Sequence, residues 1–538
     1  MNRSLYGFAG AVVALAAVAG VAAVAAPGDD DATDATSAAS AQRKPVERST
    51  LVCAKPSASD VAETTWTAFV PKGAPGKKGS AELRPAELAD PDGGTGGTDD
   101  GNGKGKGEKD GKDGKGKKRD KGRSEDAAKK RSKDDDKPVV PLSAPGTPVT
   151  STADSSEAPA LTGSADGRFA PGWTVQQTTT VSAGAGRGLQ GASCTTPDTT
   201  FWFPAVSTAK ERQDYVHLTN PDSTSAVVDL EMHGKGGKEK APSGAGEGIT
   251  VPPRSTVPVL LSTLTAEPVT NAALHVVARN GRVGAQVNAA DEKLGGDWIA
   301  PAGDPGPRAV LPGIPGDATS VRLVAFTPGG KDADLKVRLA GPTGEISPAG
   351  HETLHVKAGM TTAVDLKELT KGDPGSLVLS PAEDKAEAPP VVAAVRVTRG
   401  KGARQETAFI PSTPAVEKRA TVAENGARGT ELALTATDKD AKIKVTSSAG
   451  SGGGSPKSTT VTVKAHTTKS LAPPRPQGGK GTYAVTVERL SGGPVHASRT
   501  LTRKQDGIPA FTVQTLPDDR STVVVPDAAE DLSVLTED

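Results

Sequence analysis

The chain has 538 residues, of which 64 are Lys or Arg and 64 are Asp or Glu, so its formal net charge is zero. Because no basic excess is present to attract phosphates, we expect no nucleic-acid partner. Aromatic residues make up only 3% of the chain, whereas 63 glycines and 43 prolines are present. This composition favours small β-rich units with solvated loops over one large α/β core.

The N-terminal segment is apolar. An uncharged run rich in Ala and Val extends from Leu5 to Ala26, and Arg3 is the only charged side chain before it. A run of about 20 apolar residues can span a membrane, while small residues at its end suit a cleavage site. We therefore expect a signal peptide or a membrane anchor over residues 1–27 and a polar tether over 28–44. Both alternatives place the remaining chain outside the cytoplasm, either secreted or anchored and facing outward.

Three segments with the same order of β-prone stretches follow one another in the C-terminal half. Their first turns are expected at Asn220, Thr327 and Thr437, which gives spacings of 327 − 220 = 107 and 437 − 327 = 110 residues. The third strand of each unit is expected to begin at Val251, Val356 or Val463. A nearly constant period of this length indicates an array of similar small domains.

Each unit ends in two alternating stretches, which predict a closing β-hairpin. The predicted hairpins pair 273–279 with 283–288, 392–398 with 406–410, and 483–489 with 495–501. Segments 173–181 and 188–194 show the same pattern and indicate a fourth unit closer to the N-terminus.

The predicted fold class is mainly β, with tandem immunoglobulin-like β-sandwich modules. The first module is interrupted by a charged insert of Gly, Lys and Asp, which has too few apolar residues to fold and is expected to be disordered. The predicted boundaries are 45–92 and 139–194 for the two parts of the N-terminal module, 93–138 for the disordered insert, 195–303, 304–413 and 414–527 for three further modules, and 528–538 for an acidic tail.

The chain contains two cysteines, Cys53 and Cys194. An even number of cysteines in an exported chain predicts a disulfide, which here would connect the two ends of the N-terminal module. The alternative is a pair of free thiols or a thiol nucleophile, which an oxidising compartment disfavours.

His351, Glu352 and His355 match the H-E-x-x-H pattern of zinc metalloproteases. That chemistry needs a helix, on which two histidines four residues apart can bind one zinc ion. Pro348 and Gly350 disfavour a helix, and the repeat aligns His355 with strand residues of the other units. Residues four apart on a strand are separated by about 13 Å. We therefore predict no metal site and no catalytic residue here, and a zinc metalloprotease is the less favoured alternative.

Residues 186–191 match the G-x-G-x-x-G pattern of dinucleotide-binding proteins. That motif requires a helix directly after the glycines. Polar residues and Pro197 follow instead. We predict a hairpin turn at this position and no bound cofactor.

The densest aromatic group of the chain comprises Phe201, Trp202 and Phe203, with Tyr215 nearby. Trp and Tyr side chains form platforms that bind sugars and partner proteins, so Trp202, Phe203 and Tyr215 are a possible binding surface. The alternative is a packed seam between the first and second modules, in which Trp202 shields the disulfide.

Several of these features together resemble a family of secreted or membrane-anchored actinobacterial proteins, the domain of unknown function 5719. They are the N-terminal apolar segment, Cys53, the stretch 188–197 that contains Cys194, and Phe201, Trp202 and Phe203. The resemblance covers nearly all of the chain beyond the tether. It implies an envelope-facing, β-rich protein and supplies no catalytic residues.

We expect a non-enzymatic exported protein of the cell envelope that acts as a structural, adaptor or binding component. Its expected partner is an envelope protein or a cell-wall glycan, and also the membrane if the N-terminal segment is not cleaved. A carbohydrate-binding or cell-wall polymer-binding protein is the alternative.

Overall fold

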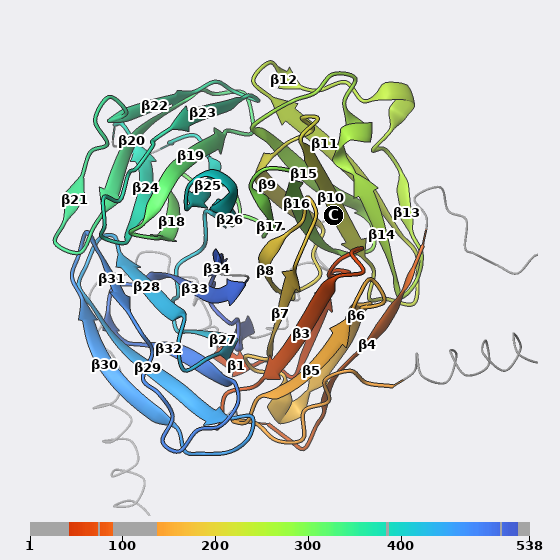
Figure 1. The fold of residues 1–538 in the computed structure, drawn as a ribbon, viewed down its shortest axis with the longest axis vertical. Helices are drawn as coiled ribbons and strands as arrows, with labels where there is room; N and C mark the ends of the chain where they lie inside the picture. The colour runs from red at the N-terminus through yellow and green to blue at the C-terminus, as the bar shows by residue number, and fades with distance from the viewer. Residues whose placement is uncertain (1–41, 74–75, 90–136, 384–386, 506–507, 526–538) are drawn as a thin grey trace, which may run out of the picture. The chain divides into compact units, whose positions relative to one another are not determined.

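The computed structural model describes residues 42–73, 76–89, 137–383, 387–505 and 508–525 (Figure 1). The predicted export segment, nearly all of the predicted insert and the predicted acidic tail lie outside these residues. None of the described segments forms a helix long and apolar enough to cross a membrane.

The chain divides into two compact units. The smaller unit comprises residues up to Lys44 and from Val524 onward, where β1 (Gln42–Pro45) pairs with β35 (Thr522–Val525). The larger unit, Pro45–Val523, holds the remaining described strands. The predicted mainly β fold is confirmed, whereas the finer comparison with immunoglobulin domains stays a prediction.

The larger unit consists of four β-sandwiches, each with a hydrophobic core of its own. The first contains β2 (Arg48–Cys53), β3 (Ala62–Phe69), β4 (Ala81–Leu88), β5 (Val149–Asp154), β6 (Ala160–Asp166), β7 (Thr174–Val181) and β8 (Gly188–Ser193). The second contains β9 (Thr200–Val206), β10 (Arg212–Thr219), β11 (Ala226–Gly234), β13 (Ile249–Val251), β14 (Ser255–Leu260), β15 (Ala272–Asn280), β16 (Gly284–Asp291) and β17 (Gly295–Ile299).

The third sandwich contains β18 (Ala309–Ile314), β19 (Ala318–Phe326), β20 (Ala333–Ala340), β22 (Thr353–Val356), β23 (Thr361–Asp365), β24 (Gly375–Pro381), β25 (Val392–Arg399) and β26 (Glu406–Pro411). The fourth contains β27 (Arg419–Asn425), β28 (Thr430–Ala436), β29 (Ala441–Gly450), β30 (Lys457–Val463), β31 (Thr467–Leu471), β32 (Tyr483–Gly492), β33 (His496–Gln505) and β34 (Ile508–Thr515). Two short strands, β12 (Gly237–Lys238) and β21 (Glu345–Ile346), pair in antiparallel fashion with β11 and β20, respectively.

The second, third and fourth sandwiches share one strand order. Numbered along each sandwich, the first, sixth, third and fourth strands form one sheet, and the fifth, second, seventh and eighth form the other. In the first sandwich, the edge of β4 is instead paired in parallel with β14 of the second sandwich, with Ser255 opposite Glu87. The two sandwiches therefore share a seven-stranded sheet.

Around the start of each predicted third strand, the structure has two consecutive strands, which belong to different sheets. β13, β22 and β30 end at Val251, Val356 and Val463, where the sequence predicts that a strand begins. The turns that follow contain one residue of positive φ each, namely Arg254 (51°), Gly359 (69°) and His466 (58°). The chain then crosses to the opposite sheet, and a run of β-prone residues does not reveal this crossing.

Two of the four predicted closing hairpins are wrong. β7 pairs with β8 and β25 with β26, as predicted. In the second sandwich, however, β15 pairs with β9 and β11 while β16 pairs with β10 and β17. In the fourth, β32 and β33 likewise belong to opposite sheets, so the hairpins that end these sandwiches are β16–β17 and β33–β34. Alternation shows which residues face a core, but it does not show which sheet a strand joins.

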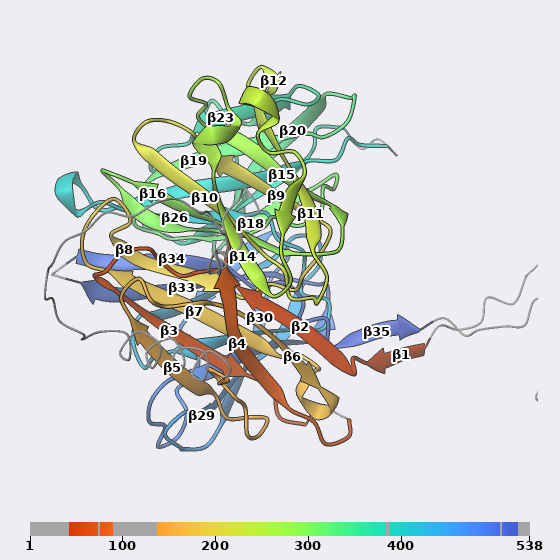
Figure 2. The same ribbon diagram turned by 90° about the vertical axis from the view of Figure 1, so that its right-hand side faces the viewer.

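The four sandwiches close into a ring. Their last strands contact one another in a cycle, β8 with β17, β17 with β26, β26 with β34 and β34 with β8, and they lie in the middle of the larger unit (Figures 1 and 2). The first strands of the second, third and fourth sandwiches also pack on the next sandwich around the ring. Thus β9 contacts β19 and β25, β18 contacts β28 and β33, and β27 returns to β3 and β7 of the first sandwich.

A buried carboxyl group joins the sandwiches at the centre of this ring. The Oδ1 atom of Asp297 in β17 accepts hydrogen bonds from the backbone N–H of Gly191 in β8 (2.9 Å) and from the hydroxyl of Thr512 in β34 (3.1 Å). Burial raises the pKa of Asp297 well above its usual range, and the nearby charge of Glu406 in β26 also raises it. Residues of all four sandwiches therefore meet at this carboxyl.

The junction between the fourth and first sandwiches is also polar. Glu424 in β27 has a positive φ of 60° and accepts a hydrogen bond from the hydroxyl of Thr178 in β7 (2.6 Å). Its other oxygen forms an ion pair with Arg503 at 2.6 Å. The hydrogen bond between Thr178 and Glu424 joins residues that are 246 positions apart in the chain.

The predicted disulfide between Cys53 and Cys194 is present. It lies in the core of the first sandwich, in the same hydrophobic cluster as Trp66 and Trp173. Trp202 belongs to a different cluster and does not shield the disulfide.

Candidate functional site

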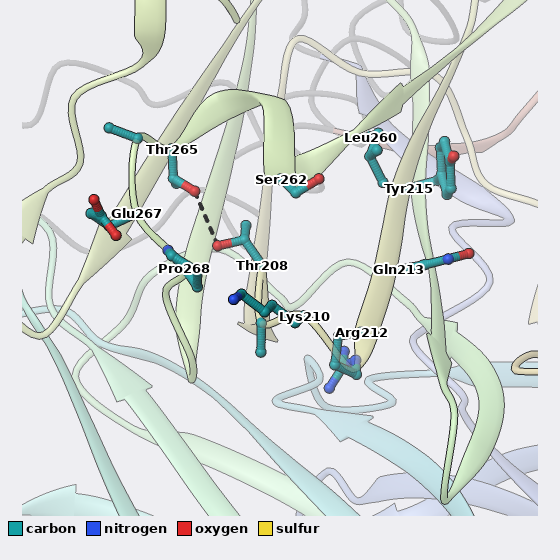
Figure 3. A pocket seen from close by; sticks show the side chains of 12 residues that line it. Thr208, Lys210, Arg212, Gln213, Tyr215, Leu260, Ser262, Thr265, Glu267 and Pro268 are labelled. Atoms are coloured by element: carbon teal, nitrogen blue, oxygen red, sulfur yellow. Dashed lines mark hydrogen bonds between the residues drawn. The ribbon is translucent and has the colours of Figure 1, made fainter.

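A pocket of about 430 Å³ lies on the second sandwich (Figure 3). We call it the Tyr215 pocket. Its walls come from β10, from the short helix η3 (Leu261–Leu264) that follows β14, and from the loops before β10 and after η3. The polar side chains that line it are those of Thr208, Lys210, Arg212, Gln213, Tyr215, Ser262, Thr265 and Glu267.

One wall of the pocket is fixed by a buried ion pair. Arg212 donates two hydrogen bonds to Asp214, from Nε to Oδ1 (2.8 Å) and from Nη2 to Oδ2 (2.7 Å). The backbone N–H of Ser207 donates to the same carboxylate at 2.8 Å. Burial raises the pKa of Asp214, whereas the charge of Arg212 and its hydrogen bonds lower it. Buried and bonded groups of this kind hold the start of β10 in one conformation.

The opposite wall is held by a hydroxyl pair. Thr208 and Thr265 lie 3.0 Å apart through their Oγ1 atoms, as the dashed line in Figure 3 shows. The backbone N–H of Val269 donates to Thr208 Oγ1 at 2.8 Å. The two loops that frame the pocket are therefore tied to each other.

The side chains around the pocket suit a polar, hydroxyl-bearing ligand. Tyr215 is half-buried and pairs in register with Leu260 of β14, so the backbone that carries its ring is held at the pocket wall. Gln213, Ser262 and Lys210 are exposed and supply an amide, a hydroxyl and an ammonium group. An aromatic face beside several hydrogen-bonding groups is the arrangement by which small polar ligands are oriented.

The three aromatic residues of the predicted binding surface are not brought together. Trp202 is 8% exposed and Phe203 is fully buried, so neither forms an open platform. Phe203 lies in the core of the second sandwich, whereas Trp202 packs against Phe326 of the third. Successive residues on a strand point to opposite faces, so Trp202 and Phe203 cannot share one surface. Of the three, Tyr215 lines the pocket described above, and Trp202 and Phe203 do not.

Trp202 is part of a packed seam, but this seam lies between the second and third sandwiches and not between the first and second. The Trp202 ring stacks on His275, with 3.7 Å between centroids and 6° between planes. Nδ1 of His275 lies 3.2 Å from Oε2 of Glu231. Burial lowers the pKa of His275, while its hydrogen bond and ion pair with Glu231 raise it.

The H-E-x-x-H residues do not form a helix. His355 lies on β22, where it pairs in register with Asp334 of β20, while His351 lies in the turn before that strand. His355 is half exposed, and its Nδ1 lies 2.7 Å from Oδ1 of Asp334. Among the described residues, no group of three or more His, Cys, Asp or Glu side chains is arranged to hold a metal ion.

The glycine-rich residues 186–191 form the end of a turn and the first part of β8, as predicted. Gly191 and Gly188 lie against other sandwiches. A Cβ atom at Gly191 would be 2.6 Å from Thr512, and one at Gly188 would be 2.5 Å from Glu406. These glycines therefore permit the close approach of strands at the ring centre.

Sequence reasoning missed the loop residues of the pocket. Lys210, Thr208 and Thr265 lie in two connections that are 57 residues apart at their paired threonines. The available signal was the repeat itself, because it aligns loops as well as strands and so predicts which loops gather at one end of a sandwich.

One family model, described as a family of unknown function (DUF5719), matches residues 149–474, which is 474 − 149 + 1 = 326 of the 538 residues. The matched stretch begins with β5 of the first sandwich and extends past β31 of the fourth. No curated protein and no solved structure matches the chain.

Proposed function

The chain belongs to the DUF5719 family, whose function is unknown, and we propose that it is a non-enzymatic, exported component of the cell envelope that acts as a structural, adaptor or binding protein. The Tyr215 pocket is its proposed contact site. The single observation that carries this proposal is the placement of Tyr215 in one pocket with hydroxyl, amide and ammonium groups.

The ring of sandwiches supports a binding role. A pocket on a scaffold with internal cores and tied loops loses little conformational entropy when it binds, which favours affinity. The walls of the Tyr215 pocket are held by the Arg212–Asp214 pair and by the Thr208–Thr265 contact. The pocket therefore presents its polar groups in fixed positions.

The proposed location rests on two features. One is the apolar N-terminal run from Leu5 to Ala26, which suits a signal peptide or a membrane anchor. The other is the Cys53–Cys194 disulfide, since disulfides persist mainly in oxidising compartments outside the cytoplasm.

The proposed ligand is a cell-wall glycan. The protein would then be a binding protein for a cell-wall polymer. Sugars present an apolar face that packs on aromatic rings and hydroxyls that bond to side chains like those of Gln213 and Ser262. An envelope protein is the second candidate partner. The zinc metalloprotease alternative loses its structural basis, because β22 replaces the helix that the motif requires.

The proposal is tested by titrating soluble oligosaccharides from cell-wall glycan into the full chain in a calorimeter. We expect saturable binding to the wild type and at least a tenfold loss of affinity in Tyr215→Ala. The matched control is Leu490→Ala, which truncates a side chain that is 49% exposed and does not line the pocket. Equal affinity in the wild type and in Tyr215→Ala would rule out the pocket as the glycan site.

A further inference from the structure

Two arginines lie side by side on the face of the third sandwich that meets the second. Arg322 of β19 is opposite Arg396 of β25, and Arg396 is opposite Phe409 of β26. Residues directly opposite each other on neighbouring strands have Cβ atoms about 5 Å apart on the same face. Phe409 packs into the core cluster of the second sandwich, so this row faces that sandwich.

Arg212 of the second sandwich meets the same row. Its guanidinium carbon lies 5.3 Å from the centre of the Phe409 ring, in a cation–π contact. Asp214 is already bonded by Arg212 and by the backbone of Ser207. The carboxylate of Asp214 is therefore already paired with Arg212, and it does not pair with Arg322 or Arg396.

The charges of Arg322 and Arg396 are not matched by bonded carboxylates. Nε of Arg322 donates to the neutral side-chain oxygen of Asn271 at 3.1 Å. Arg396 has no hydrogen bond or ion pair from its side chain to any described residue, and both arginines are half-buried. Asp291 is the other acidic group near Arg396, and its Oδ1 accepts the backbone N–H groups of Lys293 and Leu294.

This arrangement has an electrostatic cost. Burial lowers the pKa of Arg396, and the neighbouring charges of Arg212 and Arg322 lower it as well, whereas Asp291 and Asp214 raise it. Like charges placed directly opposite each other on adjacent strands destabilise a sheet. Asp365 lies opposite Arg322 on β23 but accepts the backbone N–H of Lys367, and no carboxylate of the described residues bonds to either guanidinium group of the row. A bound anion that bonds to both guanidinium groups would reduce the electrostatic cost.

We propose that Arg322 and Arg396 form a binding site for a phosphate-type oxyanion at the seam between the second and third sandwiches. The planar, five-donor guanidinium group suits phosphate oxygens, which it binds in pairs of parallel hydrogen bonds. Arg212 lies close enough to Arg396 to add to the positive potential of the site. The site shares the charge of Arg212 with the Tyr215 pocket, but Arg322 and Arg396 do not line that pocket. The anion is either free phosphate or a phosphodiester group of a polymer.

The first test measures thermal unfolding of the full chain with increasing inorganic phosphate, with sodium chloride added to keep ionic strength constant. A ligand that binds only the folded state raises the unfolding temperature as its concentration rises. We expect this increase for the wild type. Arg396→Gln should bind phosphate at least tenfold more weakly, and it should unfold at a higher temperature than the wild type in phosphate-free, low-salt buffer, because the opposed charges are gone.

Arg404→Gln is the matched control. Arg404 is exposed and lies in the loop that joins β25 to β26, so the substitution removes the same charge close to the site but outside the row. We expect its phosphate response to stay within twofold of the wild type. If Arg396→Gln does not fold, Arg396→Lys keeps the charge but loses the paired donors, and we expect at least a tenfold loss of phosphate affinity from it.

The result that would overturn the proposal is a wild-type response to phosphate no larger than that to chloride, or equal phosphate affinity in the wild type and the Arg396 variants. A second titration with poly(glycerol phosphate) separates the two sources of the anion. Tighter binding per phosphate for the polymer than for inorganic phosphate assigns the site to a phosphodiester polymer. Equal or weaker polymer binding assigns it to free phosphate.

Discussion

Closure of the ring can be tested at the contact between Gly191 of the first sandwich and Thr512 of the fourth. A Cβ atom at position 191 would lie 2.6 Å from Cγ2 and 2.7 Å from Oγ1 of Thr512. Real carbon contacts are about 3.5–4.0 Å, and Thr512 is fully buried. Overpacking of this kind costs about 1–3 kcal/mol, so we expect Gly191→Ala to reduce the free energy of unfolding by about 2 kcal/mol.

The partner substitution Thr512→Ala removes both of the atoms that would clash. Alone it should cost about 2 kcal/mol, since the hydroxyl donates to buried Asp297 and its methyl group is also buried. In the double variant the new Cβ enters the vacated space, so the two costs should not add. We expect a coupling energy of about 2 kcal/mol between positions that are 512 − 191 = 321 residues apart.

The assay is urea unfolding of the four proteins of this cycle at 25 °C, followed by tryptophan fluorescence. Residues that do not touch give additive effects within about 0.5 kcal/mol. Additivity for Gly191→Ala and Thr512→Ala would refute contact between the first and fourth sandwiches. Gly236→Ala is the control for the glycine change, since no atom lies within 4 Å of a Cβ placed there. Its effect should add to that of Thr512→Ala.

Three further predictions concern the disulfide, the ring centre and the tryptophans. Replacing Cys53 and Cys194 by Ser should lower the free energy of unfolding by up to about 5 kcal/mol in urea, the entropic value for a 141-residue loop; an unchanged urea midpoint would contradict this. Burial raises the pKa of Glu406 to about 7, against 4.5 ordinarily, although Arg187 lowers it. Since the folded state then holds the proton more tightly, stability should fall as pH rises from about 4.5 to 7; Glu406→Gln should gain up to about 3 kcal/mol relative to the wild type over that window, and parallel pH profiles would refute the assignment. Finally, each of Trp66, Trp173, Trp202 and Trp298 is at most 8% exposed, so acrylamide should quench native fluorescence several-fold less than unfolded fluorescence, and similar quenching would contradict this burial.

The repeat in the sequence predicted much of the architecture. The positions Val251, Val356 and Val463 are equivalent strand ends in three sandwiches, because each unit must bury the same alternating face. What the repeat did not show was the change of sheet after each of them. That change depends on single backbone conformations, such as the positive φ of Arg254 and His466, which non-glycine residues adopt without a clear sequence signal.

The sequence also did not predict that the four sandwiches close into a ring. Ring closure depends on contacts such as Glu424 with Thr178 and Asp297 with Thr512, which join distant parts of the chain. The sequence does not distinguish a buried carboxylate from a surface carboxylate. The partners of a buried one are known only when the arrangement of the sandwiches is known.

The candidate site was predicted in part. Tyr215 was named from its proximity to the aromatic group at 201–203, and it does line a pocket, but its neighbours there are loop residues such as Lys210 and Thr265. Trp202 and Phe203 were grouped by sequence proximity although adjacent residues on a strand face opposite ways. Applying that alternation to β9 would have separated them before the structure was known.

The most direct test of the proposed role is a pull-down from native envelope fractions with the full chain as bait, read out by mass spectrometry and glycan analysis. We expect the wild type to retain a cell-wall glycan or an envelope protein above background and Tyr215→Ala to retain less of it. Retention of nothing by the wild type, at low and at high salt, would contradict a structural, adaptor or binding role in the envelope.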